Sequence, residues 1–254
     1  MTIEPNKITI KCNSVDDISL DKVNKIMKKY NTCIISGIIN QSEIKNPMKK
    51  LKSFIEKNND LPSIGENPKK ARGFLMKFVS RIRSTKPPGV TTVVKRDIYN
   101  PLHKNDKWGF HNIFIKLAKV RNILMQKPID FALGKIEKNK MWTAARIHHF
   151  PTGAGFMFPH KDTIAPTIVK GFSKYYQVLI TLSEKGKDFK TGGGTVTYKN
   201  KLIEYENYTK PGDILIYDSR TIHGVNTIVP DKPFIQRSGE GRYSGLVTLY
   251  KLVS

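Results

Sequence analysis

The second half of the chain is a succession of short β-prone segments, and this pattern constrains the fold more than any other feature. Five segments of strand length, rich in β-branched and aromatic residues, occupy positions 141–150, 176–182, 195–198, 213–217 and 245–253. Turns containing glycine or proline separate several of them. No long helical pattern lies between them, which favours a mainly β, antiparallel jelly roll over an alternating α/β sheet.

The first half of the chain shows helical periodicity instead. We expect a helix capped by Ser19, followed by a buried strand over 32–39. A second helix is expected to begin at Asn46 with Pro47 in its first turn, and a third to end before Pro128. These N-terminal helices would pack on the outside of one sheet.

A stretch from 61 to 108 is rich in Pro, Gly, Lys and Arg and has no sustained period. It is either a substrate-covering loop or a variable insertion, and we favour the loop. The length is compatible with one domain over residues 1–254. In this interpretation residues 1–140 supply mostly helical support and covering loops, and residues 141–254 form the jelly-roll core.

The strongly positive charge raises the question of partners. The formal net charge is +23, from 44 Lys and Arg against 21 Asp and Glu. Such a surface attracts nucleic acids and other acidic partners over long range. However, only nine of the 44 cations are arginine, the residue on which phosphate and base recognition usually depends. No helix-turn-helix, zinc-finger or RNA-recognition motif is present either, so nucleic-acid binding remains the alternative.

Cysteine usage and hydropathy indicate the compartment. Cys12 and Cys33 are the only cysteines, so no disulfide framework is implied. No apolar run approaches the roughly 20 residues of a transmembrane helix, and the N-terminus lacks the apolar segment of a secretory signal. We therefore expect a cytoplasmic protein without a transmembrane segment.

Three side chains in the second half have the types and spacing of a metal site. His160 and Asp162 are two residues apart in FPHKDT, so in an extended segment both point to the same side. His223 follows the apolar segment ILIYD. Two histidines and one carboxylate leave three positions of an octahedral iron open. The alternative for an isolated His-x-Asp pair is simple solvation near a turn.

The last β-prone segment supplies a carboxylate clamp. Arg242 and Ser244 in GRYSGLVTLY lie on one face of a strand, again two residues apart. A guanidinium binds a carboxylate through two parallel hydrogen bonds, and a hydroxyl adds a third. An isolated arginine here would be an ordinary surface cation. In the company of the three metal-ligand candidates, the pair suits the distal carboxylate of 2-oxoglutarate.

The order of these motifs resembles that of the Fe(II)/2-oxoglutarate-dependent dioxygenase superfamily. The resemblance runs from His160-x-Asp162, through a glycine turn and KPGDILIYDSRTIH ending at His223, to Arg242-x-Ser244. It implies a double-stranded β-helix core that holds Fe(II) and the cosubstrate 2-oxoglutarate between two sheets. It further implies that O2 is used to oxidise a substrate C–H bond, with hydroxylation as the default outcome.

The same resemblance suggests two further cosubstrate contacts. Tyr176 and Gln177, on the β-prone segment after the metal motif, resemble positions whose side chains often contact 2-oxoglutarate in this family. The alternative for both is ordinary packing in the sheet. Arg237 is a rival carrier of the carboxylate role, but the Arg-x-Ser pattern favours Arg242, which leaves Arg237 as a candidate substrate contact.

Two more residues are candidates for substrate binding. Arg146 and His148 alternate in RIHHFPTGAG and would face the same side of a strand, with His149 pointing the other way. A core or surface role is the alternative for all three. The expected substrate is a small molecule such as an amino acid or a natural-product intermediate.

Two other functions remain open from the sequence. The first is the same oxidation carried out on a nucleic-acid base or a protein side chain that the positive surface recruits. The second is a metal-binding, cupin-like protein without oxygenase activity. Arg242 discriminates against the latter, because a simple metal-binding barrel has no need of a carboxylate clamp.

Overall fold

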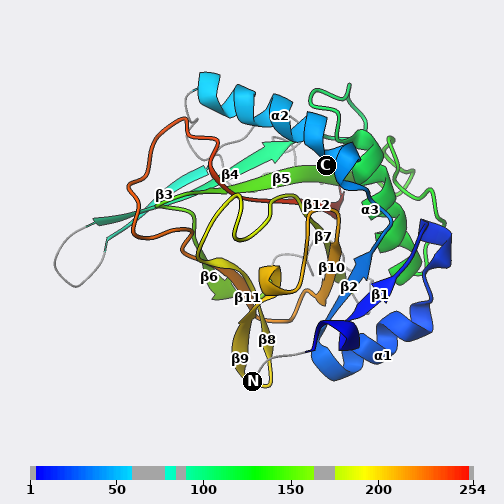
Figure 1. The fold of residues 1–254 in the computed structure, drawn as a ribbon. Helices are drawn as coiled ribbons and strands as arrows, with labels where there is room; N and C mark the ends of the chain where they lie inside the picture. Colours follow the sequence, from blue (N-terminus) through cyan, green and yellow to red (C-terminus); the bar gives the residue numbers. More distant parts are fainter. Residues whose placement is uncertain (1–3, 59–77, 84–89, 163–174, 252–254) are drawn as a thin grey trace.

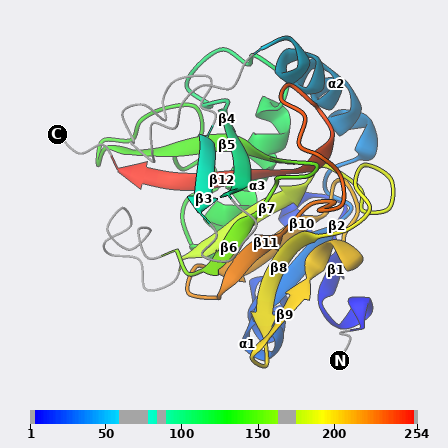
Figure 2. The same ribbon diagram turned by 90° about the vertical axis from the view of Figure 1, so that its left-hand side faces the viewer.

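The computed structural model describes residues 4–58, 78–83, 90–162 and 175–251. Within these residues the strands form an eight-stranded sheet, in the order β1-β2-β10-β7-β12-β5-β4-β3, and a four-stranded sheet, in the order β6-β11-β8-β9 (Figure 1). The ladders are antiparallel apart from the one that joins β1 and β2. Figure 2 shows the small sheet as a separate layer beside the large one.

The strands have the following bounds. Those of the large sheet are β1 (Thr9–Lys11), β2 (Thr32–Ser36), β3 (Phe78–Arg83), β4 (Val90–Tyr99), β5 (Met141–Pro151), β7 (Tyr176–Thr181), β10 (Ile214–Asp218) and β12 (Gly241–Lys251). Those of the small sheet are β6 (Met157–His160), β8 (Gly193–Tyr198), β9 (Lys201–Glu204) and β11 (His223–Asn226). All five β-prone segments expected in the second half are strands. The last strand begins earlier than expected, and residues 252–254 lie outside the described part.

Three α-helices and short 3-10 turns complete the described chain. The α-helices are α1 (Leu20–Tyr30), α2 (Gln41–Lys57) and α3 (His111–Leu124), and the 3-10 turns are Pro5–Lys7, Val15–Asp17 and Tyr205–Asn207. The Ser19 side chain accepts a hydrogen bond from the Lys22 backbone N–H, so the predicted cap of α1 is confirmed. The third helix also ends before Pro128, as predicted.

The predicted start of the second helix is wrong. Helix α2 begins at Gln41, because Asn40 and Glu43 form a capping box in which each side chain accepts a hydrogen bond from the other residue's backbone N–H. This reciprocal cap satisfies backbone donors of the first turn and extends the helix toward its N-terminus. Pro47 therefore lies inside the helix rather than in its first turn.

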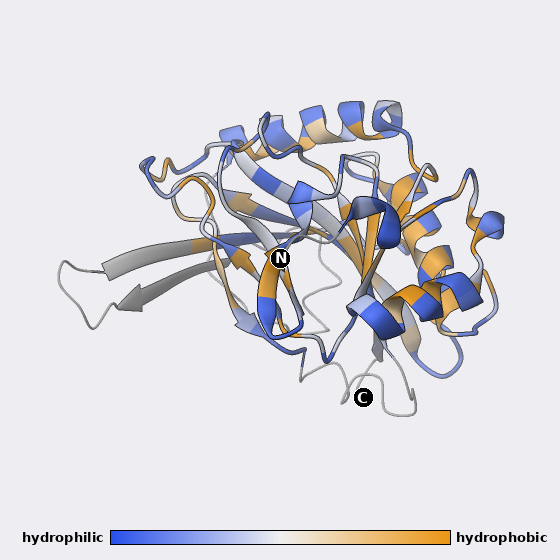
Figure 3. Ribbon diagram, turned by 60° about the horizontal axis from the view of Figure 1, so that its bottom comes forward, coloured by the Kyte–Doolittle hydropathy of each residue, from blue (hydrophilic) through white to orange (hydrophobic). Residues whose placement is uncertain are grey.

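The helices cover one face of the large sheet and the small sheet covers the other. The largest hydrophobic cluster joins the helices to alternate residues of the sheet, including Val178 and Ile180 of β7. Leu179, between them, belongs to a second cluster with Val196 of the small sheet. Figure 3 shows hydrophobic residues gathering where the helices meet the sheet. The expected mainly β, jelly-roll architecture with flanking helices is therefore confirmed.

The stretch over 61–108 differs from the expected loop. It contains β3 and β4, which pair with each other and extend the large sheet through β4 and β5. The β-branched run that forms β4 was obscured by the surrounding Pro, Gly and Lys residues, and its second pairing partner, β5, is distant in the chain. Residues 59–77 and 84–89 lie outside the described part. The region before residue 140 thus contributes four strands to the large sheet as well as the helices.

Two further sequence features can be located. Cys12 and Cys33 are both buried and free, in agreement with the absence of a disulfide framework. Among the described helices, none combines the length and the apolar character required to cross a bilayer.

Candidate metal centre

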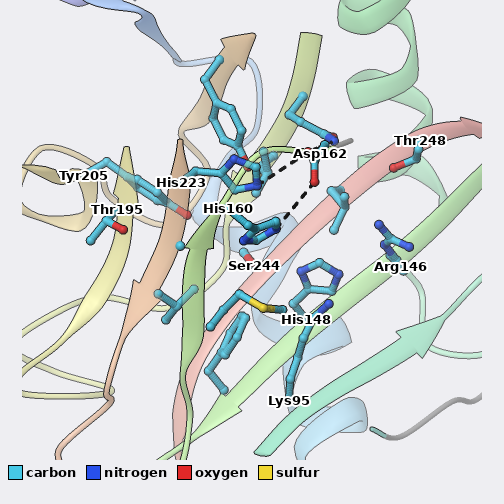
Figure 4. Close-up of a pocket in the computed structure, with 18 of the residues that line it drawn as sticks. Lys95, Arg146, His148, His160, Asp162, Thr195, Tyr205, His223, Ser244 and Thr248 are labelled. Atoms are coloured by element: carbon cyan, nitrogen blue, oxygen red, sulfur yellow. Dashed lines mark hydrogen bonds and ion pairs between the residues drawn. The ribbon is translucent and has the colours of Figure 1, made fainter. Parts of the chain in front are cut away.

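A cavity of about 370 Å³ lies between the two sheets. Every second residue of β12 from Arg242 to Tyr250 lines it, as does every second residue of β5 from Arg146 to Phe150. This alternation follows from the pleat, which turns successive side chains to opposite faces. The small sheet supplies the opposite wall, so residues that are distant in sequence face one another across the cavity (Figure 4).

The three predicted metal ligands meet in this cavity. His160 at the end of β6 and His223 at the start of β11 are paired across the small sheet, and Asp162 follows β6 directly. The Nε2 atoms of His160 and His223 each lie 3.6 Å from a different carboxylate oxygen of Asp162. One ligand atom from each residue can be chosen such that all lie within 4.8 Å of one another. These three form the metal-binding group that the described residues present.

The backbone holds both imidazoles in the orientation of metal ligands. Nδ1 of His160 lies 2.7 Å from the carbonyl oxygen of Phe158, and Nδ1 of His223 lies 2.9 Å from that of Thr221. A carbonyl oxygen only accepts hydrogen bonds, so Nδ1 is the donor in each case, which leaves Nε2, on the side of Asp162, as the nitrogen available to a metal. A separation of 3.6 Å is too long for a hydrogen bond, and it places the donor atoms close enough to converge on one metal ion.

Burial also favours the neutral form of the His223 imidazole, which is the form that binds a metal. Desolvation lowers the pKa of this imidazole and outweighs the opposing effect of the Asp162 carboxylate. A metal requires the neutral imidazole, so the environment of His223 favours the protonation state that binds it.

Gln177 orients the carboxylate of the triad. Its Nε2 donates a hydrogen bond of 2.6 Å to Oδ2 of Asp162, and its own Oε1 is buried with no hydrogen-bond partner among the described residues. The backbone N–H of Asp162 is anchored separately to the carbonyl of Ser219 at 3.1 Å. Gln177 therefore lines the cavity as a hydrogen-bond partner of a candidate metal ligand, a type of residue that can fix ligand geometry.

Arg242 lies in the same cavity, and its guanidinium is held from several sides. The side chain is 2% exposed, and its Nε donates to the carboxylate of Glu206. Nη2 donates to the hydroxyl of Tyr205, and Nη1 lies 3.3 Å from Oγ of Ser244. A guanidinium has five N–H donors, so two of them remain after these three contacts, one on each terminal nitrogen.

The Glu206 carboxylate stabilises the charged form of the Arg242 guanidinium. Burial lowers the pKa of Arg242, but the Glu206 carboxylate and the neighbouring phenols raise it by more, so the guanidinium stays charged. For Glu206 itself, desolvation raises the pKa despite the hydrogen bonds from Arg242 and the Gly194 backbone. Arg242 is thus a buried cation, and its partner Glu206 is a buried carboxyl group whose ionised form is disfavoured by desolvation.

Two more polar side chains adjoin the Arg242 end of the cavity. Tyr205 lines it beside Arg242, and Thr195 has a buried Oγ1 with no hydrogen-bond partner among the described residues. Gly194 makes this arrangement possible, because a Cβ at that position would collide with the Tyr205 hydroxyl and ring. A buried hydroxyl and a guanidinium with spare donors that line one cavity are groups that can bind a carboxylate.

Arg146 and His148 line the other end of the cavity. Nη1 of Arg146 donates to the hydroxyls of Tyr99 and Tyr250 at 3.2 and 2.9 Å. His148 also lines the cavity, and burial lowers the pKa of its imidazole to about 3. Figure 4 shows the triad between Thr195 and Tyr205 on one side and Arg146 on the other.

Asp97 organises the charges beside His148. Its Oδ1 lies 3.0 Å from Nε2 of His148 and 3.1 Å from Nζ of Lys95. The desolvation of the Asp97 carboxyl is outweighed by Lys95, by the contact with His148 and by Arg146, which together hold its pKa far below the usual range. Lys95 itself lines the cavity.

Two candidates from the sequence, Tyr176 and Arg237, lie away from the cavity lining. Tyr176 faces the helices, where its hydroxyl donates to Oδ1 of Asn24 at 3.3 Å. Arg237 is exposed, with a positive φ of 65°. His149 points to the opposite side from His148, as predicted, and stacks on Tyr243 with ring centroids 4.1 Å apart.

Sequence reasoning missed the residues that surround Arg242. Tyr205 and Glu206 belong to a 3-10 turn between β9 and β10, and Thr195 follows Gly193 and Gly194 within β8. Lys95 was hidden in the stretch interpreted as a loop. Their sequence signal was weak, since each is a single polar residue whose partner is far away in the chain. The glycine turn before Thr195 was the one indication that a close backbone approach occurs there.

Comparisons with known proteins agree on the fold. No family model and no curated protein sequence matches the chain. The Trichoplax adhaerens prolyl hydroxylase solved with a hypoxia-inducible-factor peptide is similar at TM-score 0.55 and 14% identity, over 91% of this chain and 89% of that one. The alpha-ketoglutarate-dependent carbocyclase SnoK from nogalamycin biosynthesis is similar at TM-score 0.56 and 10% identity, over 94% and 86%.

A third neighbour was solved with a cosubstrate. EctD from S. alaskensis with 2-oxoglutarate and 5-hydroxyectoine is similar at TM-score 0.51 and 13% identity, over 99% of this chain and 82% of that one. At these identities the likeness concerns the fold. The chain therefore has the fold of the Fe(II)/2-oxoglutarate-dependent oxygenases, and the resemblance predicted from its motifs is confirmed at that level.

Proposed function

We propose that this protein is an Fe(II)- and 2-oxoglutarate-dependent oxygenase. The observation that carries the proposal is that two independent binding groups line one cavity: the triad of His160, Asp162 and His223, and the buried Arg242. The donor set of two imidazoles and one carboxylate suits non-haem Fe(II) and leaves coordination positions open. The fold shared with known oxygenases of this type supports the assignment.

The roles of the residues follow from their contacts. The triad would hold Fe(II), with Gln177 fixing the Asp162 carboxylate. Arg242, with Ser244, would bind the distal carboxylate of 2-oxoglutarate through its two spare N–H donors, and the Tyr205 and Thr195 hydroxyls adjoin that site. Iron and 2-oxoglutarate, once bound, supply the oxygen activation that oxidises a C–H bond, with hydroxylation as the default outcome.

A small molecule is the substrate that the cavity fits best. Its volume of about 370 Å³ is near the lower end of small-molecule sites, which run from roughly 300 to 1,000 Å³. The second candidate is the same reaction on a protein side chain or a nucleic acid, favoured by the net charge of +23. Turnover against small-molecule, peptide and oligonucleotide panels separates the two candidates.

Two further parts of the assignment are proposals. The chain is interpreted as one oxygenase domain over residues 1–254, because the N-terminal strands continue the sheet that carries the cavity. A reducing, cytoplasmic location accords with the two free cysteines.

Cosubstrate binding by Arg242 variants tests the proposal. We expect Arg242→Ala to keep metal affinity but to weaken 2-oxoglutarate binding about 100-fold, since a charge-assisted, forked contact is lost. Arg242→Lys is the companion variant: it keeps a cation beside Glu206, which limits damage to the fold, but it removes the fork. Calorimetric titration of 2-oxoglutarate into the anaerobic Mn(II)-loaded protein measures both.

A surface arginine provides the matched control. Arg220 is 73% exposed and pairs with Asp218, so Arg220→Ala should leave 2-oxoglutarate affinity unchanged. Equal cosubstrate affinity in wild type and both Arg242 variants would defeat the assignment of the clamp. A wild-type protein that binds metal but no 2-oxoglutarate would instead identify a metal-binding, cupin-like protein.

A further inference from the structure

A second concave surface lies on the helical side of the large sheet, away from the metal cavity. It is an open groove between helix α2 and the turn that connects β4 to α3 (Figure 1). Four lysines and two aromatic residues dominate its lining: Lys49, Lys50, Lys57, Lys107, Phe54 and Trp108. We call this set the lysine groove. Within the described residues, no carboxylate lines it.

Helix α2 presents three faces, and one of them forms a wall of the groove. The buried face packs into the hydrophobic core. On the second face Lys52 forms an ion pair of 3.2 Å with Asp188, and Lys52 and Glu56 lie against Gly239. The third face carries the exposed side chains of Lys49, Lys50 and Lys57.

The sequence of α2 leaves these three lysines without a neutralising carboxylate. Ion pairs along a helix join residues three or four positions apart. At those distances from the three lysines, the helix contains only Lys, Asn, Ser, Pro and Phe. The two carboxylates of α2 are directed elsewhere, since Glu43 pairs with Lys116 at 2.8 Å and Glu56 lies against Gly239. A helix face that is only solvated usually carries both signs of charge, so this face is unusual.

The turn before α3 adds a fourth cation. Nζ of Lys107 lies 4.8 Å from the ring centroid of Phe54 and 5.2 Å from that of Trp108, so cation–π attraction holds it over the aromatic floor of the groove. The neighbouring Asp106 carboxylate is directed away, because it accepts hydrogen bonds from backbone N–H groups at the start of α3. Lys107 therefore adds its charge to that of the helix face.

The lining discriminates between two kinds of anionic partner. A single-stranded nucleic acid usually needs exposed aromatic faces on which its bases stack. Trp108 is 2% exposed and Lys107 lies over the ring of Phe54, so the groove offers little aromatic surface to a base. A peptide with acidic side chains needs only the cations. Lys49 and Lys57 are about 12 Å apart along the helix, a distance that roughly four residues of an extended peptide span.

We propose that the lysine groove binds an acidic peptide segment of a partner protein. Carboxylates of the segment pair with the four lysines, and the charge on both sides of the groove favours a chain that lies along it. Because the lysines are exposed, each contact is weak and sensitive to salt, and the affinity comes from several contacts together. The groove shares no residue with the metal cavity, so this interaction goes beyond the proposed function.

Fluorescence anisotropy with labelled probes tests the proposal. The main probe is an octapeptide of alternating Glu and Gly, which in an extended form presents its carboxylates on one side. One reference probe has Gln in place of each Glu, and the other is an oligothymidylate with the same number of negative charges. In about 0.15 M salt, we expect the full chain to bind the Glu peptide at least about tenfold more tightly than either reference.

Two triple variants with equal loss of charge locate the contact. The groove variant carries Lys49→Gln, Lys57→Gln and Lys107→Gln. The control variant carries Lys135→Gln, Lys138→Gln and Lys140→Gln, at exposed positions outside the groove. We expect the groove variant to bind the Glu peptide about tenfold more weakly than wild type and the control variant to stay within about twofold. Equal Tm values would show that all three proteins are folded alike.

Several results would overturn the proposal. The first is no binding of the Glu peptide by wild type, and the second is equal binding of the Gln peptide. An equal loss in both triple variants would assign the attraction to the overall charge of the protein. Tighter binding of the oligothymidylate, lost in the groove variant, would make the groove a nucleic-acid surface instead. The groove variant should keep the 2-oxoglutarate affinity of wild type, so a failure of this inference and a failure of the proposed function are seen separately.

Discussion

The carboxylate of Glu206 pairs with the guanidinium of Arg242 inside the cavity wall, and both side chains are 2% exposed. A buried arginine without a charged partner would lower the stability of the folded state. Pairing with Glu206 therefore allows the ligand-free protein to hold a cation in the cavity. Under the proposed function, a bound dicarboxylate would share the guanidinium with the Glu206 carboxylate. The cosubstrate affinity would then depend on the competition between the two carboxylates.

Replacing Glu206 separates its effect on the stability of the fold from its effect on cosubstrate affinity. Glu206→Gln keeps the shape and one acceptor but leaves the buried cation unbalanced, so we expect the free energy of unfolding to fall by about 3 kcal/mol. The carboxylate of 2-oxoglutarate then restores the balance. The rise in Tm on adding 2-oxoglutarate, with Mn(II) present, should accordingly be larger in Glu206→Gln than in wild type. A smaller rise would show that Glu206 positions Arg242 for cosubstrate rather than opposing it.

The contact between Gln177 and Asp162 predicts an effect on metal affinity. Gln177→Leu keeps the volume but removes the 2.6 Å hydrogen bond to the carboxylate ligand. We expect Mn(II) affinity, measured by titration, to fall between about 10- and 100-fold, as is usual when a partner of a metal ligand is lost. Tyr176→Phe, the adjacent residue on the other face of β7, should leave metal affinity unchanged; an equal loss in both would point to a general defect in the strand.

Gly194 predicts a selective loss of cosubstrate binding. In Gly194→Ala the added methyl group must displace Tyr205, which contacts Arg242, so 2-oxoglutarate affinity should fall about tenfold while metal affinity is retained. Gly186→Ala is the control, because a Cβ there meets open space and only its positive φ is strained. Unchanged 2-oxoglutarate affinity in Gly194→Ala would contradict the placement of Tyr205 at the cosubstrate site.

His148 predicts a pH dependence of stability. Its pKa is lowered from 6.5 to about 3 by burial, chiefly, with Lys95 and Arg146 adding to the effect against Asp97. Between these values the unfolded chain binds a proton that the folded protein does not, so stability falls as the pH drops from 6.5 toward 3. Denaturant unfolding of metal-free protein between pH 6.5 and 4.5 measures the slope.

The variant His148→Gln isolates this contribution. Its slope should be shallower than that of wild type by up to about 1.4 kcal/mol per pH unit, the value for one proton. Identical slopes, or an NMR titration of His148 centred near its ordinary pKa, would contradict the buried, neutral imidazole.

Part of the candidate metal site could be predicted from the sequence because that part is local. His160 and Asp162 are two residues apart on an extended segment, so strand periodicity orients this pair, whereas His223 was identified from the order of the motifs and reaches the pair through the β6–β11 ladder. The same pleat correctly placed Arg146 and His148 on one face and His149 on the other.

The remaining features depend on long-range packing. The partners of Arg242 come from a 3-10 turn 36 and 37 residues earlier, and no local pattern marks them. Tyr176 was expected beside Gln177, but adjacent strand residues face opposite ways, so only one of them could enter the cavity. The predicted start of helix α2 is too late, because the prediction rested on Pro47 rather than on the capping box of Asn40 and Glu43.

An anaerobic crystal structure with Mn(II) and 2-oxoglutarate tests the central claim most directly. We predict the metal bound by Nε2 of His160, Nε2 of His223 and the Asp162 carboxylate, with the distal carboxylate of 2-oxoglutarate on the terminal nitrogens of Arg242. Metal at another position, or 2-oxoglutarate bound away from Arg242, would contradict the account.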